Sequence, residues 1–286
     1  MTGRLVRRGA LSAVFAGSVL VLGGCTTAVT SETEAPRLEH VHAIAPSPGD
    51  DTLLIASHNG IFELTPAGDL EGPLGGHVFD AMGFAVVGDA LYASGHPGDA
   101  GSADWGAPNL GLIHSDDTGE TWQAVALSDR TDFHALAAAP DGWVFGIPSD
   151  GTGLLVGADE GSQWARGGLP DAVDLVATDA ALFAATEDGL LSSVDGGSTF
   201  EAVPDAPVLY AIDAHPEGAL AGVGTDGTIW VERTAGAWER VERTEGAAQA
   251  FAVDGDRYLV VDDRGVVEVT ERGTKVLLSP VVATAG

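Results

Sequence analysis

The chain has 286 residues, of which 45% are hydrophobic, and its formal net charge is −29 at pH 7. This apolar fraction is too high for a disordered protein and is sufficient for a large core. The negative charge argues against a nucleic-acid partner and against adhesion to an anionic membrane, because both would repel it. Since the chain has one cysteine, it cannot form an internal disulfide.

Residues 1–24 have the layout of a bacterial export signal, with three arginines, an apolar stretch over 10–22 and small residues before Cys25. The apolar stretch is short for a membrane span that persists in the mature protein. The segment "LGGC" resembles a bacterial lipobox, which implies that Cys25 is lipidated and becomes the new N-terminus. We therefore expect a signal peptide over 1–24 and a protein anchored by lipid to the cell membrane, facing the extracytoplasmic side. An ordinary signal peptide or a simple N-terminal anchor is the alternative.

Residues 25–37 are small and polar after the cysteine, and they predict a flexible tether. Beyond them, short alternating or apolar runs broken by Gly, Asp and Asn predict an all-β fold. A unit of strand, glycine turn and strand recurs, as in "LLIASHNGIFEL" (53–64), "LFAATEDGLLSS" (182–193) and "YLVVDDRGVVEV" (258–269). Glycine suits these turns because it accepts a positive φ.

The repetition predicts a six-bladed β-propeller over residues 38–280, with a C-terminal tail over 281–286. A seventh, unrecognised blade is the alternative. The predicted blades span about 38–72, 77–126, 131–169, 172–204, 208–243 and 246–280.

A polar turn late in several units follows the pattern S-x-D-x-G-x-T-W or a reduced form of it. Its aromatic residues lie 36 to 42 residues apart, which is the spacing of blades. We expect the Asp to accept backbone N–H bonds, the glycine to permit the bend and the aromatic ring to pack beneath. The pattern resembles the Asp box, or BNR repeat, of sialidase-like β-propellers, and the resemblance implies a structural role away from the active face. The residues concerned are Ser115, Asp117, Gly119 and Trp122; Asp159, Gly161 and Trp164; and Ser193, Asp195, Gly197 and Phe200.

The innermost strands of the predicted blades carry a polar or donor residue at one shared position. Aligned on their small apolar residues, the strands place a ring of side chains around the channel: His42, Met82, His134, Asp174, Tyr210 and Gln249. Alternate residues of a strand point the same way, so His40, Asp80 and Asp132 should lie on the same face two residues earlier. The turns at that face add His58 and His96.

Histidines gathered with carboxylates are a ligand set for Zn, Fe, Ni or Cu(II), and the thioether of Met82 favours copper. The predicted metal ligands are His40, His42, His58, Asp80, Met82, His96 and His134. The chain has no compact metal-binding motif, so this prediction rests on the alignment of the blades. The alternative is a polar channel mouth whose histidines are solvated or hydrogen-bonded, as in many propellers.

The segments "HVHAIA", "SHNGIF", "DAMGF", "ASGHP" and "DFHALA" resemble a group of bacterial secreted lipoproteins that are labelled sialidase-like or glycosyl-hydrolase-like. The resemblance implies that the predicted metal ligands form a shared functional face. The sequence leaves open whether the chain is an enzyme. A sialidase binds its substrate with three arginines and uses a tyrosine nucleophile. Tyr210 lies in the ring, but the arginines near this face are loop residues beside acidic ones.

The leading hypothesis is therefore a lipid-anchored propeller that binds a transition metal, copper or zinc, at the channel mouth. A sialidase-like glycoside hydrolase and a non-catalytic module that binds a glycan or a protein are the alternatives. We expect a monomer.

Overall fold

The computed structural model describes residues 38, 40–98, 105–168, 171–234 and 236–280. Cys25, the predicted signal and tether, and the tail over 281–286 lie outside these residues. Within the described residues, no helix is both long and apolar enough to cross a membrane.

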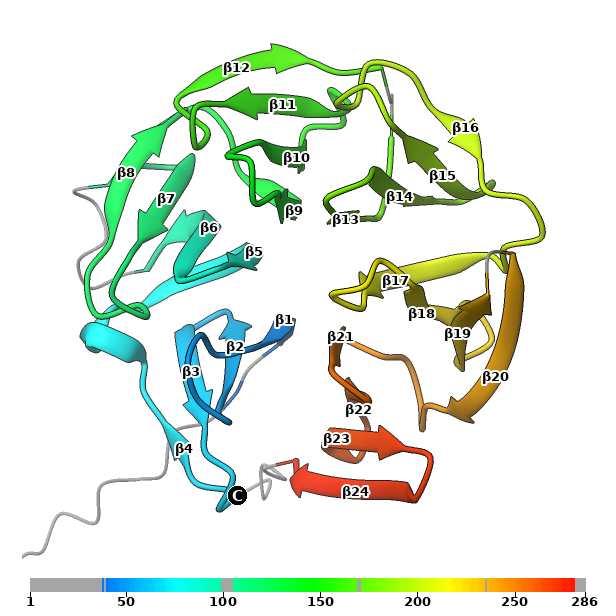
Figure 1. The fold of residues 1–286 in the computed structure, drawn as a ribbon. Helices are drawn as coiled ribbons and strands as arrows, with labels where there is room; N and C mark the ends of the chain where they lie inside the picture. The colour runs from blue at the N-terminus through cyan, green and yellow to red at the C-terminus, as the bar shows by residue number, and fades with distance from the viewer. Residues whose placement is uncertain (1–37, 39, 99–104, 169–170, 235, 281–286) are drawn as a thin grey trace, which may run out of the picture. The chain divides into compact units, whose positions relative to one another are not determined.

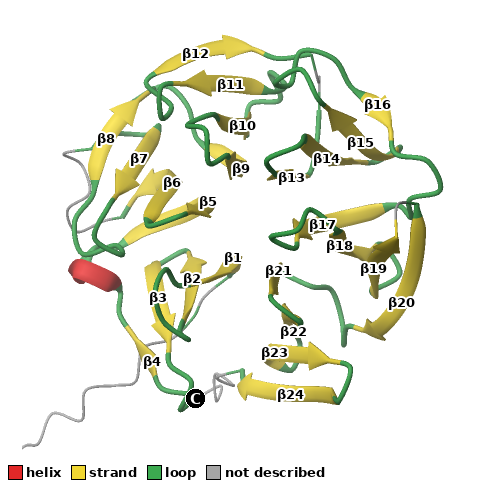
Figure 2. Ribbon diagram, viewed as in Figure 1, coloured by secondary structure: helices red, strands yellow, loops and turns green. Residues whose placement is uncertain are grey.

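The residues from 38 to 280 form six four-stranded antiparallel sheets that follow one another around a central channel (Figure 1). Each sheet is built from four strands consecutive in the sequence, so the prediction of an all-β, six-bladed propeller is confirmed. One short 3-10 helix, η1 (Leu74–Gly76), joins the first two sheets (Figure 2).

The blades are as follows, from the inner to the outer strand. Blade one contains β1 (Val41–Pro46), β2 (Leu53–Ser57), β3 (Gly60–Leu64) and β4 (Leu70–Glu71). Blade two contains β5 (Phe79–Val87), β6 (Ala90–Pro97), β7 (Leu112–Ser115) and β8 (Gln123–Ala126). Blade three contains β9 (Phe133–Ala138), β10 (Val144–Pro148), β11 (Leu155–Ala158) and β12 (Gln163–Arg166).

The second half of the ring repeats this order. Blade four contains β13 (Asp174–Ala177), β14 (Leu182–Thr186), β15 (Gly189–Ser193) and β16 (Glu201–Ala202). Blade five contains β17 (Leu209–Ala214), β18 (Leu220–Gly224), β19 (Thr228–Thr234) and β20 (Ala237–Arg243). Blade six contains β21 (Ala250–Asp254), β22 (Arg257–Asp262), β23 (Gly265–Thr270) and β24 (Gly273–Leu278). These spans fall within the blades expected from the repeats.

The core lies between neighbouring blades, where the faces of their sheets meet. Ile55 of blade one and Leu259 of blade six are both fully buried in one cluster, which closes the ring between the first and last blades. A side chain of this size contributes about 1.5–3 kcal/mol when it is removed from water. Because each sheet is continuous in sequence, this packing rather than a shared sheet joins the two ends of the propeller.

The polar turns between the third and fourth strands have the geometry expected of them. In the turn after β7, Thr121 donates its backbone N–H to Asp117 at 2.8 Å, and Gly119 donates to the buried Ser115 hydroxyl at 2.9 Å. The indole of Trp122 donates to the Gly119 carbonyl at 3.1 Å. Hydrogen bonds from Thr199 and Ser193 lower the pKa of Asp195, in the equivalent turn of blade four, to about 2. These turns are structural.

The inner strands contain an irregularity that the sequence did not reveal. In four of them the pairing with the second strand skips one residue, which is the ring residue in each case: His42, Met82, His134 and Tyr210. Such an extra residue is a β-bulge, which bends the strand and changes the direction of its side chain. The bulges therefore set the direction of the ring residues.

Gly95 is required where blade two carries Asp80 toward the channel mouth. A Cβ at this position would lie 1.9 Å from the Asp80 carbonyl oxygen, and its φ of +144° is a conformation that L residues rarely adopt. Gly189 has a similar φ of +132°, but a Cβ added there would meet no other heavy atom within 4 Å.

We predict that Gly95→Ala lowers the free energy of unfolding more than Gly189→Ala. The control carries only the backbone strain, which costs about 1–3 kcal/mol, whereas Gly95→Ala adds the collision with Asp80. Denaturant unfolding of both variants measures the difference. Equal losses would show that blade two tolerates a wider separation of β5 and β6.

Candidate metal centre

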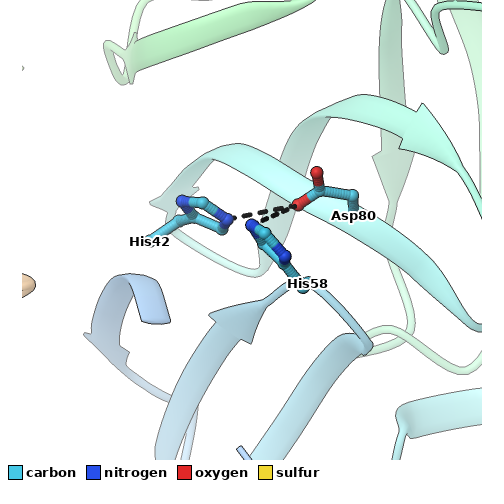
Figure 3. Close-up of side chains that lie close together, drawn as sticks. All are labelled: His42, His58 and Asp80. Carbon is cyan, nitrogen blue, oxygen red and sulfur yellow. Dashed lines mark ion pairs between the residues drawn. The ribbon is translucent and has the colours of Figure 1, made fainter. Parts of the chain in front are cut away.

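The structure brings three of the predicted ligands together at the interface of blades one and two. His42 Nε2 lies 3.2 Å from Asp80 Oδ1, and His58 Nε2 lies 3.8 Å from the same oxygen (Figure 3). One ligand atom from each residue lies within 4.8 Å of the others. Among the residues that the structure describes, this is the group of His, Asp or Glu side chains close enough to share one ion.

Each member of the group reaches the site by a different local feature. His42 is the bulge residue of β1, and Asp80 comes from β5 of the next blade. His58 occupies the two-residue turn between β2 and β3, where its backbone N–H donates to the His40 carbonyl at 3.3 Å. The site therefore exists only when two blades pack together.

The imidazoles of blade one form a stack of three rings. His58 lies between the other two, with its ring centroid 4.8 Å from that of His40 and 4.7 Å from that of His42. The sequence placed His40 and His42 together because alternate strand residues share a face. The structure joins them differently: β1 begins after His40, which has a φ of +45°, and both rings meet through His58. His40 itself lies outside the three-ligand group.

The closest contact in the group is the ion pair between His42 and Asp80. His42 Nε2 and Asp80 Oδ1 are both buried and lie 3.2 Å apart, and neither atom has a hydrogen-bond partner outside this pair. Burial acts to raise the pKa of Asp80, but the contact with His42 and the charges of His42, His58 and His96 outweigh it, so the pKa lies below its usual value. The carboxylate is therefore ionised at neutral pH, which is the form that binds a cation.

His96 and Met82 lie one blade further on. His96 Nε2 is 3.6 Å from Asp132 Oδ2, and the same carboxylate oxygen accepts the Ser149 hydroxyl at 2.5 Å. Met82 is half-buried at the bulge of β5. The sequence placed Asp132 at this mouth, but the contribution of Ser149 was missed, because a lone serine in a turn carries no pattern.

The remaining ring residues bind the backbone of the next blade. His134 Nε2 is 3.3 Å from the Ala172 carbonyl, and the Tyr210 hydroxyl accepts the Ala248 N–H at 2.9 Å. Gln249 Oε1 accepts the Val41 N–H at 3.0 Å. These contacts give three predicted channel residues a structural role.

Asp174 also joins its blade to the backbone of the next, here blade four to blade five, and we call such a side-chain contact a clamp. It accepts the N–H of Ile212 at 2.8 Å and that of Leu175 at 2.8 Å. Burial raises its pKa to about 7 despite these hydrogen bonds, and the neighbouring charge of Asp213 acts in the same direction. Asp213 accepts the Val253 N–H of blade six at 2.7 Å, and burial raises its pKa to about 6.

The channel between the inner strands has a volume of about 590 Å³ and is lined by His42, His134, Asp174, Tyr210 and Gln249 together with small apolar residues. No arginine is among the described residues that line it. The arginines predicted to approach this face include Arg243, whose guanidinium bonds to the Asp226 carbonyl, and Arg264, which pairs with Asp262 at 2.6 Å. The cation set that a sialidase needs is not assembled in the described channel.

Comparisons with known proteins identify the fold. No protein family and no curated protein matches the sequence. Among solved structures, a chain of a nidogen/laminin complex has a TM-score of 0.59 at 14% identity, covering 77% of this chain and 89% of that one. A streptogramin B lyase has a TM-score of 0.57 at 14% identity, covering 84% and 83%. The GH74 xyloglucanase of Xanthomonas campestris has a TM-score of 0.56 at 16% identity, covering 87% of this chain and 46% of that one.

These neighbours include propeller enzymes and a chain of a nidogen/laminin complex. Likeness at this identity shows the architecture, and function depends on the site carried by it. The specific assignment to Asp-box sialidase-like proteins is not confirmed.

The clamps predict an unusual dependence of stability on pH. The pKa of Asp174 is higher in the folded chain, at about 7, than its ordinary value of 3.8. A raised pKa contributes stability that is complete below about pH 4 and is lost as the pH rises to about 7. We therefore expect the unfolding free energy of the parent, taken relative to that of Asp174→Asn, to fall as the pH rises from about 4 to about 7.

Thermal or denaturant unfolding at a series of pH values measures that difference. Asp195→Asn is the control with the opposite sign, because its lowered pKa contributes stability that is lost as the pH falls through about 2. A difference between parent and Asp174→Asn that stays constant from pH 4 to 7 would contradict the assignment.

Proposed function

We propose that this protein is an extracytoplasmic, lipid-anchored propeller that binds a transition metal through His42, His58 and Asp80. The observation that carries the proposal is the close approach of His42 Nε2, His58 Nε2 and Asp80 Oδ1: one ligand atom from each residue lies within 4.8 Å of the others, and His42 Nε2 is 3.2 Å from Asp80 Oδ1. Ligands of one tetrahedral ion, with bonds of about 2.0 Å, lie about 3.3 Å from each other. An ion between His42 Nε2 and Asp80 Oδ1 would be bound by both atoms.

His58 is suited to complete the ligand set. Its side chain is 42% exposed and its Nε2 is 3.8 Å from Asp80 Oδ1, so a small movement of the turn would close the site around an ion. Three protein ligands leave a coordination position for water or another molecule. Because the site faces solvent, the ion could be exchanged with a carrier or a chelator.

Copper is the favoured ion and zinc is the alternative. Imidazole suits both, and among divalent first-row metals Cu²⁺ binds a given set of N and O ligands most tightly. The net charge of −29 supports the proposal in a general way, because an acidic surface attracts cations.

A glycoside hydrolase is the second candidate. The observation that favours it is the similarity in fold to a GH74 xyloglucanase. A hydrolase would require two carboxylates across the scissile bond, and Asp80 and Asp132 are the carboxylates that this mouth offers. A sialidase has less support, because the Tyr210 hydroxyl is bonded to the Ala248 backbone and no arginine lines the described channel. A non-catalytic module that binds a glycan or a protein would need neither group.

We predict that the full chain carrying Cys25→Ser, which removes the thiol, binds one equivalent of Cu²⁺ or Zn²⁺ tightly. His58→Ala and Asp80→Asn should each weaken this binding at least tenfold, because each removes one of the three ligands. Isothermal titration measures the affinity, and thermal unfolding checks that the variants are folded.

His114→Ala is the matched control, because this histidine lies on β7 with its ring 5.0 Å from that of Tyr92, outside the metal group. If His58→Ala and Asp80→Asn bind both ions as tightly as the control does, the site is wrongly assigned. Cleavage of xyloglucan or of sialic-acid conjugates by metal-free protein would instead favour the second candidate.

The lipid anchor has its own test. We predict that the parent chain, expressed in a bacterium that processes lipoproteins, is found in the membrane fraction with a lipid mass on its N-terminal cysteine. Cys25→Ser should carry no lipid mass, because the residue that would receive the lipid is gone. Fractionation and mass spectrometry of the N-terminal peptide measure this, and a parent protein without lipid would contradict it.

A further inference from the structure

The contact between His58 and Asp80 recurs one blade further along the ring. His58 follows Ser57, which pairs with Val41 next to the bulge of β1. His96 follows Gly95, which pairs with Ala81 next to the bulge of β5. Each of the two histidines contacts a carboxylate of the next blade. The distances are similar, at 3.8 Å from His58 Nε2 to Asp80 and 3.6 Å from His96 Nε2 to Asp132.

The third member of the group recurs as well, with a change of chemistry. His42 is the bulge residue of β1, and Met82 is the bulge residue of β5. The set formed by His42, His58 and Asp80 thus corresponds, one blade on, to Met82, His96 and Asp132. Blade three breaks the series: Ala172 replaces the carboxylate, and His134 instead meets the carbonyl of Ala172.

The hydrogen bonds around His96 and Asp132 prepare them to bind an ion. His96 Nδ1 lies 3.2 Å from the Pro108 carbonyl, which can only accept, so Nδ1 carries the proton. In the neutral form of the ring, Nε2 would then carry the lone pair that binds an ion. A metal-binding histidine is usually oriented in this way by a carbonyl behind it. Ser149 holds the carboxylate through its hydroxyl at 2.5 Å, and its backbone N–H donates to the Asp132 carbonyl at 3.1 Å.

We propose that Met82, His96 and Asp132 form a second metal site, selective for the soft ion Cu⁺. A thioether is a ligand that selects Cu⁺, and imidazole also binds copper. Met82 is the sole methionine after the initiator, and with Cys25 outside the propeller it is the sole sulfur ligand in residues 38–280. This site has its own ligands and does not depend on occupation of the first.

The two sites are neighbours. Asp80 pairs directly opposite His96 across β5 and β6, and directly opposite residues in a sheet have Cβ atoms about 5 Å apart. A channel mouth with both sites would accept copper in either oxidation state, with the hard set of blade one suited to Cu²⁺ and the soft set of blade two suited to Cu⁺.

The test uses Ag⁺ as a redox-inert substitute for Cu⁺, and Zn²⁺ as a probe of the first site. All arms use the full chain with Cys25→Ser, so that Met82 is the one sulfur ligand besides the initiator. We expect Met82→Leu and His96→Gln each to weaken Ag⁺ binding at least tenfold and to leave Zn²⁺ binding within twofold of the parent. His58→Ala should have the reverse pattern. Leucine nearly conserves the volume of methionine, so folding should be retained, and thermal unfolding checks this.

Each result has a defined meaning. Ag⁺ binding that is unchanged in Met82→Leu would overturn the second site. Ag⁺ binding that is lost equally in His58→Ala and His96→Gln would also overturn it, because a single shared site would then hold the ion. In that case, Zn²⁺ binding that is lost in His58→Ala and kept in His96→Gln would still support the proposed function. If Zn²⁺ binding is unchanged in His58→Ala while Ag⁺ binding depends on Met82 and His96, the first site is wrong and the second site stands.

Discussion

From blade three to blade six, the inner ring of this propeller is held by side chains that bond to the backbone of the next blade. Asp174 reaches Ile212, Tyr210 reaches Ala248, and Gln249 reaches Val41, which links the last blade to the first. The apolar clusters between blades supply most of the stabilisation, but they are non-directional. The side-chain bonds fix how each inner strand stands relative to its neighbour, and the shape of the channel depends on them.

The first two blades depart from this arrangement. The bulge residues there are His42 and Met82, and Nε2 of His42 pairs with the side chain of Asp80 rather than with the backbone of blade two. In four blades the polar side chains of the inner ring thus bond to the backbone, whereas between blades one and two His42 and His58 pair with the side chain of Asp80.

The pKa values of the aspartates also differ between these two groups of blades. Burial raises the pKa values of Asp174 to about 7 and of Asp213 to about 6, so the clamps of the far side carry reduced negative charge at mildly acidic pH. Near the histidines, the pKa of Asp80 is lowered and its carboxylate stays ionised. Negative charge at the mouth is therefore concentrated beside the imidazoles, where a cation would be held.

The sequence alone determined the class of fold and the number of blades, because strand and turn chemistry are local and recur at blade spacing. It also indicated which residues share the channel mouth, since aligned repeats occupy equivalent places in a ring. It could not indicate which of them touch. The bulges at His42 and Met82 break the alternation on which a strand prediction relies, and the His42–Asp80 contact spans two blades whose relative position is decided by packing. The ring residues His134, Tyr210 and Gln249 look equivalent to His42 in sequence, and only the tertiary structure separates them, because their partners are backbone atoms of the next blade.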